Sequence, residues 1–301
     1  MQRLAKKQSL HDKTRILGIA LVIPAILFIA YTMIIPIGWN LVLSFAKWDG
    51  FSSMKMLGLD NYKELFQDTT TLNGFKYSVI IALLSSAITL LLGFILALLV
   101  YQTGKKEGSV FRLIFFAPNM MPFIVIGLLF AFLLSPDMGL FNQIFRAMGL
   151  ESLDRAWLGE PGLVLVTLSV VSGWKGSGGV MMLLYTAMVA IPASMFEAAR
   201  LEGANFFQQV RLIVLPLIMP TIRLVSMLVL IGSFKSYDII ATMTKGGPGD
   251  YSKTVPKQML DVAFFYNEFG YAAAIGVVFT ILVAIIIFVM RKLARGDVYE
   301  Y

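Results

Sequence analysis

Two apolar stretches of the sequence contain charged and polar side chains that could bind a solute. The first is the run Gly173-Trp174-Lys175-Gly176-Ser177-Gly178-Gly179, and the second spans residues 233–238. A tryptophan ring can stack on a sugar, while amines, hydroxyls and carboxylates make hydrogen bonds. Ionisable residues are costly inside a membrane and point to function. The candidates for a substrate path are Trp174, Lys175, Ser233, Lys235, Tyr237 and Asp238.

Each of these groups also has a structural explanation. The glycines around Lys175 either unwind a helix at mid-depth, where transporters bind substrates, or allow two helices to pack closely. Lys235 and Asp238 are three residues apart, so on one helix they share a face and can pair with each other. Arg223, a further ionisable residue, can extend its side chain to the membrane surface.

Enzymatic chemistry has little support in this sequence. It contains no cysteine and one histidine, His11, which argues against disulfides, metal sites of the usual ligand sets and histidine-based catalysis. No Gly-x-x-x-x-Gly-Lys-[Ser/Thr] phosphate-binding sequence and no nucleophile elbow occur. We therefore expect no enzyme, no metal and no cofactor in this chain.

The elements that must position these residues are membrane-spanning helices. The sequence is 58% hydrophobic and 14% charged, with a mean hydropathy of +0.78, whereas soluble domains carry about 25% charged residues. Six segments reach the length of about 20 apolar residues that a span requires. We predict an all-α membrane protein, a single domain over residues 1–301. Its predicted spans are residues 16–38, 77–101, 110–134, 162–190, 217–243 and 271–290.

The distribution of charged residues over the loops predicts on which side of the membrane the termini lie. The two terminal segments and the loops 102–112 and 191–211 together hold 13 Lys and Arg against 6 acidic residues. The three remaining loops hold 9 against 11. Because cytoplasmic loops carry the excess of basic residues, both termini should be cytoplasmic. The net charge of +7 fits this asymmetry better than nucleic-acid binding, since no basic face is interleaved with exposed aromatics.

Two of the outer loops carry helical patterns. Residues 59–62 begin one short pattern, and Leu140, Ile144 and Met148 recur at helical spacing in the loop 135–161. The second pattern predicts a helix that lies on the outer membrane surface.

The loop between the fourth and fifth spans has the richest pattern. Pro192 suits a helix start, and Ser194 with Glu197 three residues later has the form of a capping box. Gly203 allows a turn, and a second helix should begin near Asn205. The loop therefore predicts two short helices at an angle on the cytoplasmic face.

This loop resembles the coupling motif of bacterial binding-protein-dependent ABC permeases. The motif reads Glu-Ala-Ala, three residues, Gly, nine residues, Ile-x-Leu-Pro. The matching positions are Glu197, Ala198, Ala199, Gly203, Ile213, Leu215 and Pro216. Further resemblance to sugar permeases lies at residues 36–45, 58–66, 244–249 and 269–274. The chain is similar to the MalF-type subunit of the carbohydrate branch, without its extra N-terminal spans and large periplasmic insertion.

The resemblance implies a multi-pass permease of the bacterial inner membrane. It implies a second homologous permease, an ATPase dimer that binds ATP and Mg²⁺ and docks on the coupling motif, and an extracytoplasmic binding protein that delivers a sugar or oligosaccharide. The alternatives are the same machinery importing glycerol phosphate or another polar solute, and, in a different class, an ion-driven secondary transporter. The second class would have no use for the docking loop.

Overall fold

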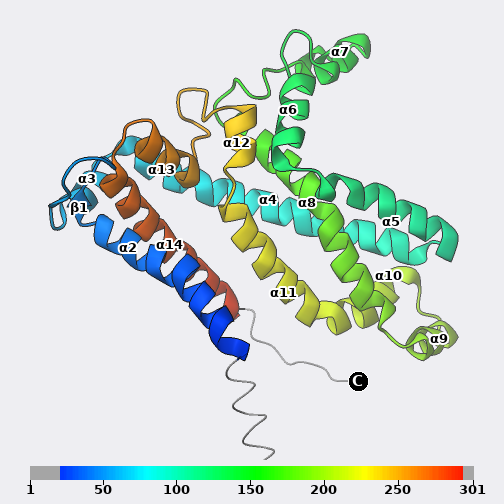
Figure 1. The fold of residues 1–301 in the computed structure, drawn as a ribbon. Helices are drawn as coiled ribbons and strands as arrows, with labels where there is room; N and C mark the ends of the chain where they lie inside the picture. The colour runs from blue at the N-terminus through cyan, green and yellow to red at the C-terminus, as the bar shows by residue number, and fades with distance from the viewer. Residues whose placement is uncertain (1–20, 294–301) are drawn as a thin grey trace, which may run out of the picture. The chain divides into compact units, whose positions relative to one another are not determined.

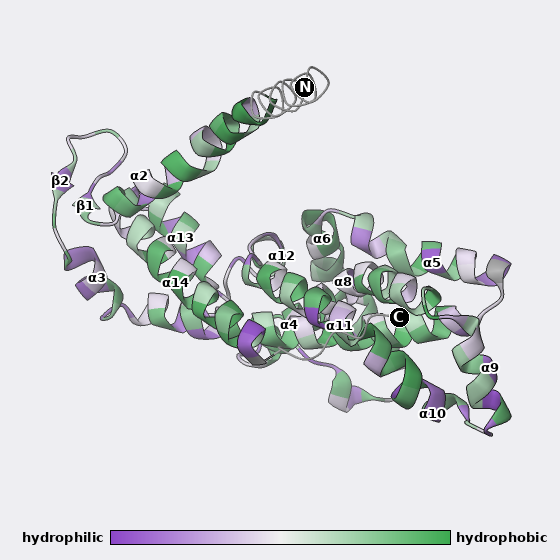
Figure 2. Ribbon diagram, turned by 90° about the horizontal axis from the view of Figure 1, so that it is seen from below, coloured by the Kyte–Doolittle hydropathy of each residue, from purple (hydrophilic) through white to green (hydrophobic). Residues whose placement is uncertain are grey.

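The computed structural model describes residues 21–293, and its regular structure is almost entirely helical (Figure 1). The residues before Leu21, which include the start of the first predicted span and the basic N-terminal run, lie outside the described residues. The same holds for the chain from residue 294, where Arg295 contributes to the predicted charge asymmetry. Within residues 21–293, five helices are long and apolar enough to cross a membrane, and a bent helix pair would make six. Figure 2 shows hydrophobic residues along these long helices and hydrophilic residues mainly in the connections.

The chain divides into two compact units. The described part of the first comprises residues 21–65 and 262–277, and that of the second comprises residues 66–261 and 278–293. Nothing in this division tests the prediction of one domain over residues 1–301.

In the first unit, the helix Leu21–Leu43 contains a π-helical turn, η1 (Ala30–Ile34), and continues as α2 (Ile35–Leu43). It ends five residues beyond the predicted 16–38. The short antiparallel strands β1 (Ala46–Lys47) and β2 (Lys55–Met56) follow, and then α3 (Asp60–Leu65). The buried Asn61 amide donates to the carbonyls of Ser44 and Ala46, both at 2.9 Å, which fixes α3 beside the strands. The helical pattern predicted at residues 59–62 is therefore present.

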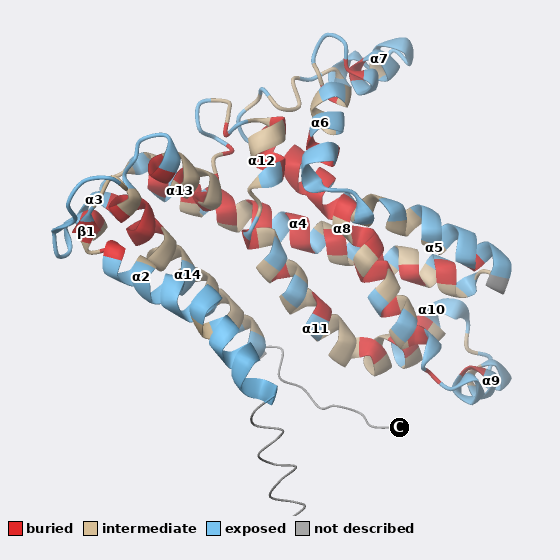
Figure 3. Cartoon of the chain, in the orientation of Figure 1, coloured by how far each residue is buried: buried red, intermediate tan, exposed pale blue. Residues whose placement is uncertain are grey.

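The second unit is built around two long helices, α4 (Thr69–Gln102) and α8 (Leu163–Val189). Helix α8 packs most extensively on α4 and next on α5 (Lys105–Met120). Two-thirds of the spanning window of α8 is buried inside the chain, whereas none of the Leu21–Leu43 window is. Figure 3 shows this contrast, with buried residues along α8 and exposed residues along α2.

The third predicted span, 110–134, is not one straight helix. It consists of α5 and α6 (Phe123–Leu133), bent by 93° at Met121 and Pro122. Both residues have extended backbone angles, because proline disfavours helical geometry in the residue before it. The pair forms either one broken span or a re-entrant loop, so the predicted third span stays a prediction.

The fourth predicted span carries no break. Helix α8 is continuous from Leu163 to Val189 through all four glycines, so the expectation of an unwound centre was wrong. The glycines instead permit close packing. A Cβ atom on Gly173 would lie 2.5 Å from the Ile88 side chain of α4, and one on Gly178 would lie 2.2 Å from the Phe115 carbonyl of α5. Small residues at such interfaces let helix backbones approach each other.

The fifth predicted span, 217–243, ends early. The continuous helix Phe206–Phe234 contains α10 (Phe206–Gln209), the π turn η3 (Val210–Val214) and α11 (Leu215–Phe234). After a break, α12 (Asp238–Met243) begins. Lys235 and Asp238 therefore do not share a helix, and within residues 21–293 no ion pair joins them. The predicted pairing was wrong.

The remaining helices are α7 (Leu140–Ala147), the 3₁₀ turn η2 (Glu151–Leu153), α9 (Ala193–Leu201), α13 (Val255–Phe264) and α14 (Phe269–Leu293). Helix α7 confirms that the Leu140 pattern is helical, and its apolar side chains are exposed. Its place on an outer membrane surface stays a prediction.

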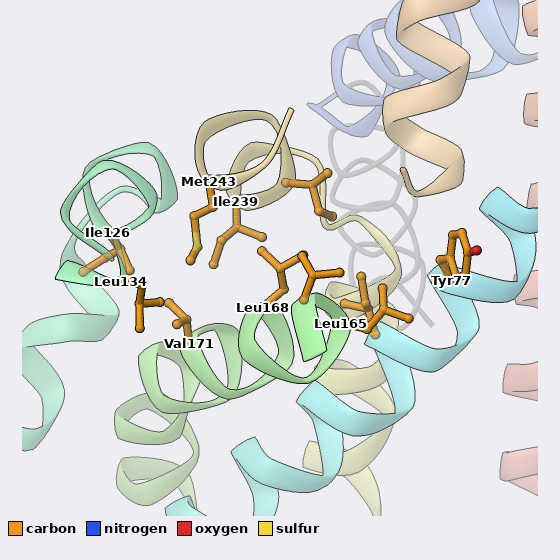
Figure 4. Packing of buried hydrophobic residues seen from close by; sticks show 11 residues of the cluster. Tyr77, Ile126, Leu134, Leu165, Leu168, Val171, Ile239 and Met243 are labelled. Carbon is orange, nitrogen blue, oxygen red and sulfur yellow. The ribbon is translucent and has the colours of Figure 1, made fainter. Parts of the chain in front are cut away.

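Two apolar clusters hold the second unit together along α8. The first joins α4, α6, α8 and α12 through residues such as Ile126, Leu168, Ile239 and Met243 (Figure 4). The second joins the other half of α8 to α4, α9 and α11. Between them, residues 172–179 of α8 are serine, lysine and glycine, with Trp174 as the single large apolar side chain.

Candidate functional site

A cavity of about 490 Å³ lies beside this polar section of α8. Ser172, Lys175, Gly176 and Gly179 line it from α8, while Asn119 and Phe123 line it from the α5–α6 bend. The break between α11 and α12 supplies its other side. That side comprises Ser233, Lys235, Ser236, Tyr237 and Asp238. Five of the six predicted substrate-path residues thus line one cavity, although they come from α8, α11, α12 and the break between the last two.

The sixth candidate, Trp174, lies outside this cavity. Its ring contacts Phe130 of α6, with ring centres 5.4 Å apart, and the residue is 39% exposed. Consecutive residues on a helix point about 100° apart. Because Lys175 faces the cavity, its neighbour Trp174 faces elsewhere.

Lys175 is the most buried charged residue of the site, at 6% exposed. Its Nζ donates to the Asn119 carbonyl at 3.3 Å and lies 4.1 Å from the centre of the Phe123 ring. The bend explains why this carbonyl is available, because an uninterrupted helix would direct it to the amide of residue 123. One of the two explanations that the sequence offered for the glycines was a broken helix at Lys175 itself, whereas the break beside Lys175 lies between α5 and α6.

Ser172 stands one turn before Lys175 on the same face of α8. Ser172 is 8% exposed, and its hydroxyl has no hydrogen-bond partner within the described chain. Sequence reasoning missed Ser172 and Asn119. Ser172 could have been found from its helical spacing to Lys175, and Asn119 from its position just before Pro122.

The break after Phe234 is held by hydroxyl groups. Ser236 Oγ donates to the Ser233 carbonyl at 2.7 Å, and Thr254 Oγ1 donates to the Ser236 carbonyl at 3.1 Å. Ser233 Oγ in turn accepts from Ser86 Oγ of α4 at 3.1 Å. The non-helical segment at the cavity wall therefore runs from Lys235 to Tyr237, and Asp238 opens the helix that follows.

A second group of predicted residues lies in and after α9. The N-cap of α9 is Pro192, which makes no side-chain cap bond, so the assignment of Ser194 as the cap was wrong. Gly203 has φ of +79°, and the amides of Gly203 and Ala204 donate to the carbonyls of Arg200 and Ala199, at 3.0 and 2.9 Å. This pair of bonds is the Schellman motif that ends a helix at glycine. The predicted turn at Gly203 is therefore confirmed.

The helix after the turn begins as predicted. Asn205 caps α10, and Asn205 and Gln208 form a reciprocal capping box. This helix is not separate from the next span, since η3 connects it directly to α11. The partly buried Ile213 lies in η3, while Leu215 and Pro216 open α11. The π turn precedes Pro216 because proline has no amide to donate to the preceding turn.

Helix α9 presents part of its surface and buries one anchor. Glu197 and Ala198 are exposed and Ala199 is half-buried, while Phe196 is 8% exposed. The Phe196 ring packs on Tyr101 at the end of α4, with centres 6.0 Å apart, and joins the apolar cluster with residues of α8 and α11. A force applied to α9 would therefore reach three long helices.

Known proteins similar to this chain are transport permeases. The family described as binding-protein-dependent transport system inner membrane component matches residues 89–296, more than half of the chain. A probable ABC transporter permease protein, YurN of Bacillus subtilis, is 34% identical over 90% of this chain and 93% of its own length. The diacetylchitobiose uptake system permease NgcF of Streptomyces coelicolor is 29% identical over 91% of this chain and 81% of its own.

A solved structure has the same fold. It is a bacterial alginate ABC transporter in complex with an alginate pentasaccharide-bound periplasmic protein. The match has a TM-score of 0.82 at 20% identity and covers 94% of this chain and 95% of the other.

Proposed function

Because this chain belongs to the binding-protein-dependent transport system inner membrane components, and is a permease of an ABC transporter, we propose that it forms part of the membrane path for a saccharide. The proposal of a saccharide draws on the likeness to the NgcF permease, whose system takes up diacetylchitobiose. As a transport component the chain is not itself an enzyme.

In this proposal, the complete importer has several further parts. A second homologous permease completes the path, an ATPase dimer binds ATP and Mg²⁺, and an extracytoplasmic binding protein delivers the sugar. The importer resides in the bacterial inner membrane. Both termini and α9 face the cytoplasm, as the uneven distribution of lysine and arginine favours.

The single observation that carries this function is the form of α9. Its sequence motif is complete, its Glu197–Ala198 surface is exposed, and its Phe196 is anchored among α4, α8 and α11. Small side chains fit a cleft on a partner, and the anchor gives that contact a rigid connection to the spans. Glu197, Ala198, Ala199 and Gly203 make the contact with the ATPase, and Ile213, Leu215 and Pro216 position the helix that follows.

A substitution at Gly203 tests the coupling role. No atom lies within 4 Å of a Cβ built on Gly203, so a side chain there meets nothing in this chain. Gly203→Ala strains the positive φ only, whereas Gly203→Asp tolerates that φ better than alanine but puts a charge in the space that a partner would occupy. We expect Gly203→Asp to abolish ATP-driven uptake in proteoliposomes while the permease stays in the membrane, and Gly203→Ala to retain part of it. Wild-type uptake by Gly203→Asp would contradict the assignment.

The substrate path uses the cavity beside α8. Lys175, Ser233, Lys235, Tyr237 and Asp238 provide hydrogen-bonding groups, and a volume of about 490 Å³ lies within the range of about 300–1,000 Å³ that is usual for small-molecule sites. Trp174 offers a partly exposed ring on another side of α8. The two lysines at the cavity also favour a second candidate solute of the same machinery, glycerol phosphate.

A further inference from the structure

The cavity beside α8 has an unbalanced charge. Its charged lining residues are two lysines, Lys175 and Lys235, and one carboxylate, Asp238. In their ionised forms these three groups sum to one positive charge. None of the ion pairs formed within residues 21–293 involves any of them. A solute with one negative charge would therefore neutralise the site.

The imbalance is most costly at Lys175. The amine is taken out of water, and its two neighbours are a backbone carbonyl and the face of an aromatic ring. A carbonyl and a ring attract an ammonium group, but neither carries a compensating charge. Buried charges are normally paired, because an unpaired one loses its hydration without a Coulombic return. An ammonium group has three donors, so Lys175 also retains hydrogen-bonding capacity.

Ser172 provides a second donor at the same place. It lies three residues before Lys175, hence on the same helix face, lines the same cavity, and has a buried hydroxyl without a partner. Buried polar atoms are nearly always hydrogen-bonded, and an exception indicates a missing partner. A carboxylate can accept several hydrogen bonds, so an amine and a hydroxyl one helical turn apart are both possible donors to it.

We propose that this cavity binds an acidic saccharide, with the carboxylate of a uronate unit placed against Lys175 and Ser172. The proposal rests on the saccharide function and specifies its chemical class. A single carboxylate balances the single excess charge, whereas a phosphate monoester carries about −1.5 to −2 charges at pH 7 and would overcompensate it. Tyr237 also lines the cavity and brings an aromatic ring to it.

The test measures binding to the assembled importer in detergent without its binding protein, so that the selectivity of that protein does not enter. The probes are α-1,4-galacturonosyl-galactose, which carries one carboxylate, and the neutral α-1,4-galactobiose, which has the same linkage and no carboxylate, with glycerol 3-phosphate as a third. We expect galacturonosyl-galactose to bind at least about tenfold more tightly than galactobiose, which corresponds to one charge-assisted hydrogen bond.

The variants identify the residues responsible. Lys175→Met should remove the preference for galacturonosyl-galactose, and Ser172→Ala should reduce it several-fold. Lys106→Met removes a lysine that does not line the cavity and should keep the preference. Size-exclusion chromatography checks that each variant still assembles with its partners. If Lys175→Met does not assemble, the sugar preference of Ser172→Ala serves as the test.

Two outcomes would overturn the inference. Equal or tighter binding of galactobiose, or an unchanged preference in both Lys175→Met and Ser172→Ala, would exclude a carboxylate at this position while leaving a saccharide importer in place. Binding of glycerol 3-phosphate alone would overturn both the acidic saccharide and the broader saccharide proposal.

Discussion

At the scale of single residues, the side chain that connects α9 to the spans is Phe196. It is the buried member of a helix whose neighbouring positions, Glu197 and Ala198, are exposed. Its role follows from packing, because a ring that is held by the ends of three long helices moves with them. The same residue must therefore matter both for stability and for coupling.

Phe196→Ala should destabilise the permease, since deleting a buried phenylalanine side chain typically costs about 3–5 kcal/mol. The measurement is thermal unfolding of the purified protein in detergent. Phe207→Ala is the matched control, because Phe207 is 80% exposed and its loss leaves no internal cavity. Equal melting temperatures for the two variants would show that Phe196 is not an anchor.

At the scale of the elements, the contact between α4 and α8 depends on small residues. On α4, the buried residues Ser85, Thr89, Gly93 and Ala97 recur every four positions and form one narrow stripe. A Cβ on Gly93 would lie 2.6 Å from the Val180 side chain of α8. The two backbones therefore approach each other at distances that larger residues would not permit.

We expect Gly93→Leu and Gly173→Leu to reduce the yield of folded, monodisperse permease strongly, because each new side chain would separate α4 from α8. Gly38→Leu is the control, since it is also a helical glycine but nothing lies within 4 Å of a Cβ there. The readout is fluorescence-detected size-exclusion chromatography. Normal yields from both core variants would contradict close packing as the reason for these glycines.

The sequence predicted most helices because apolar length is a strong signal, and it failed where a break depends on local chemistry. The bend at Pro122 was predictable, since the residue before a proline resists helical geometry. The π turns also had a sequence signal, because each one is followed by an isoleucine or leucine and then by a proline, Pro36 or Pro216. No comparable residue pattern predicts the break at Lys235–Tyr237. Its hydrogen bond from Thr254 comes from a distant part of the chain.

The sequence likewise predicted some features of the candidate site and not others. Ionisable residues in apolar stretches identified Lys175, Lys235 and Asp238 individually, because their cost in lipid is independent of context. Their gathering at one cavity depends on which helices break, and the sequence pattern offered a break in α8 only as one of two explanations for its glycines. Ser172 could not be distinguished from other serines in the sequence. Whether a serine hydroxyl has a hydrogen-bond partner depends on the folded chain.

At the scale of the whole molecule, orientation in the membrane is the main property that the fold leaves to experiment. The prediction places Ser53 and Ser152 outside and Ser194 in the cytoplasm, and all three residues are exposed. Cysteines at Ser53 and Ser152 should react with an impermeant maleimide in intact cells, and a cysteine at Ser194 should react only after permeabilisation. The chain has no native cysteine to interfere. Labelling of Ser194→Cys in intact cells would reverse the orientation.

The polar section of α8 also has a consequence for biosynthesis. Among the five long helices α8 is the least apolar and the most buried, and it alone carries a lysine halfway along its length. A translocon releases a segment into lipid according to its own apolarity, so α8 is the helix least able to enter the bilayer by itself. It needs α4, which is synthesised earlier and offers the stripe that α8 covers. The residues that equip the permease to hold a solute therefore make one helix depend on another for its insertion.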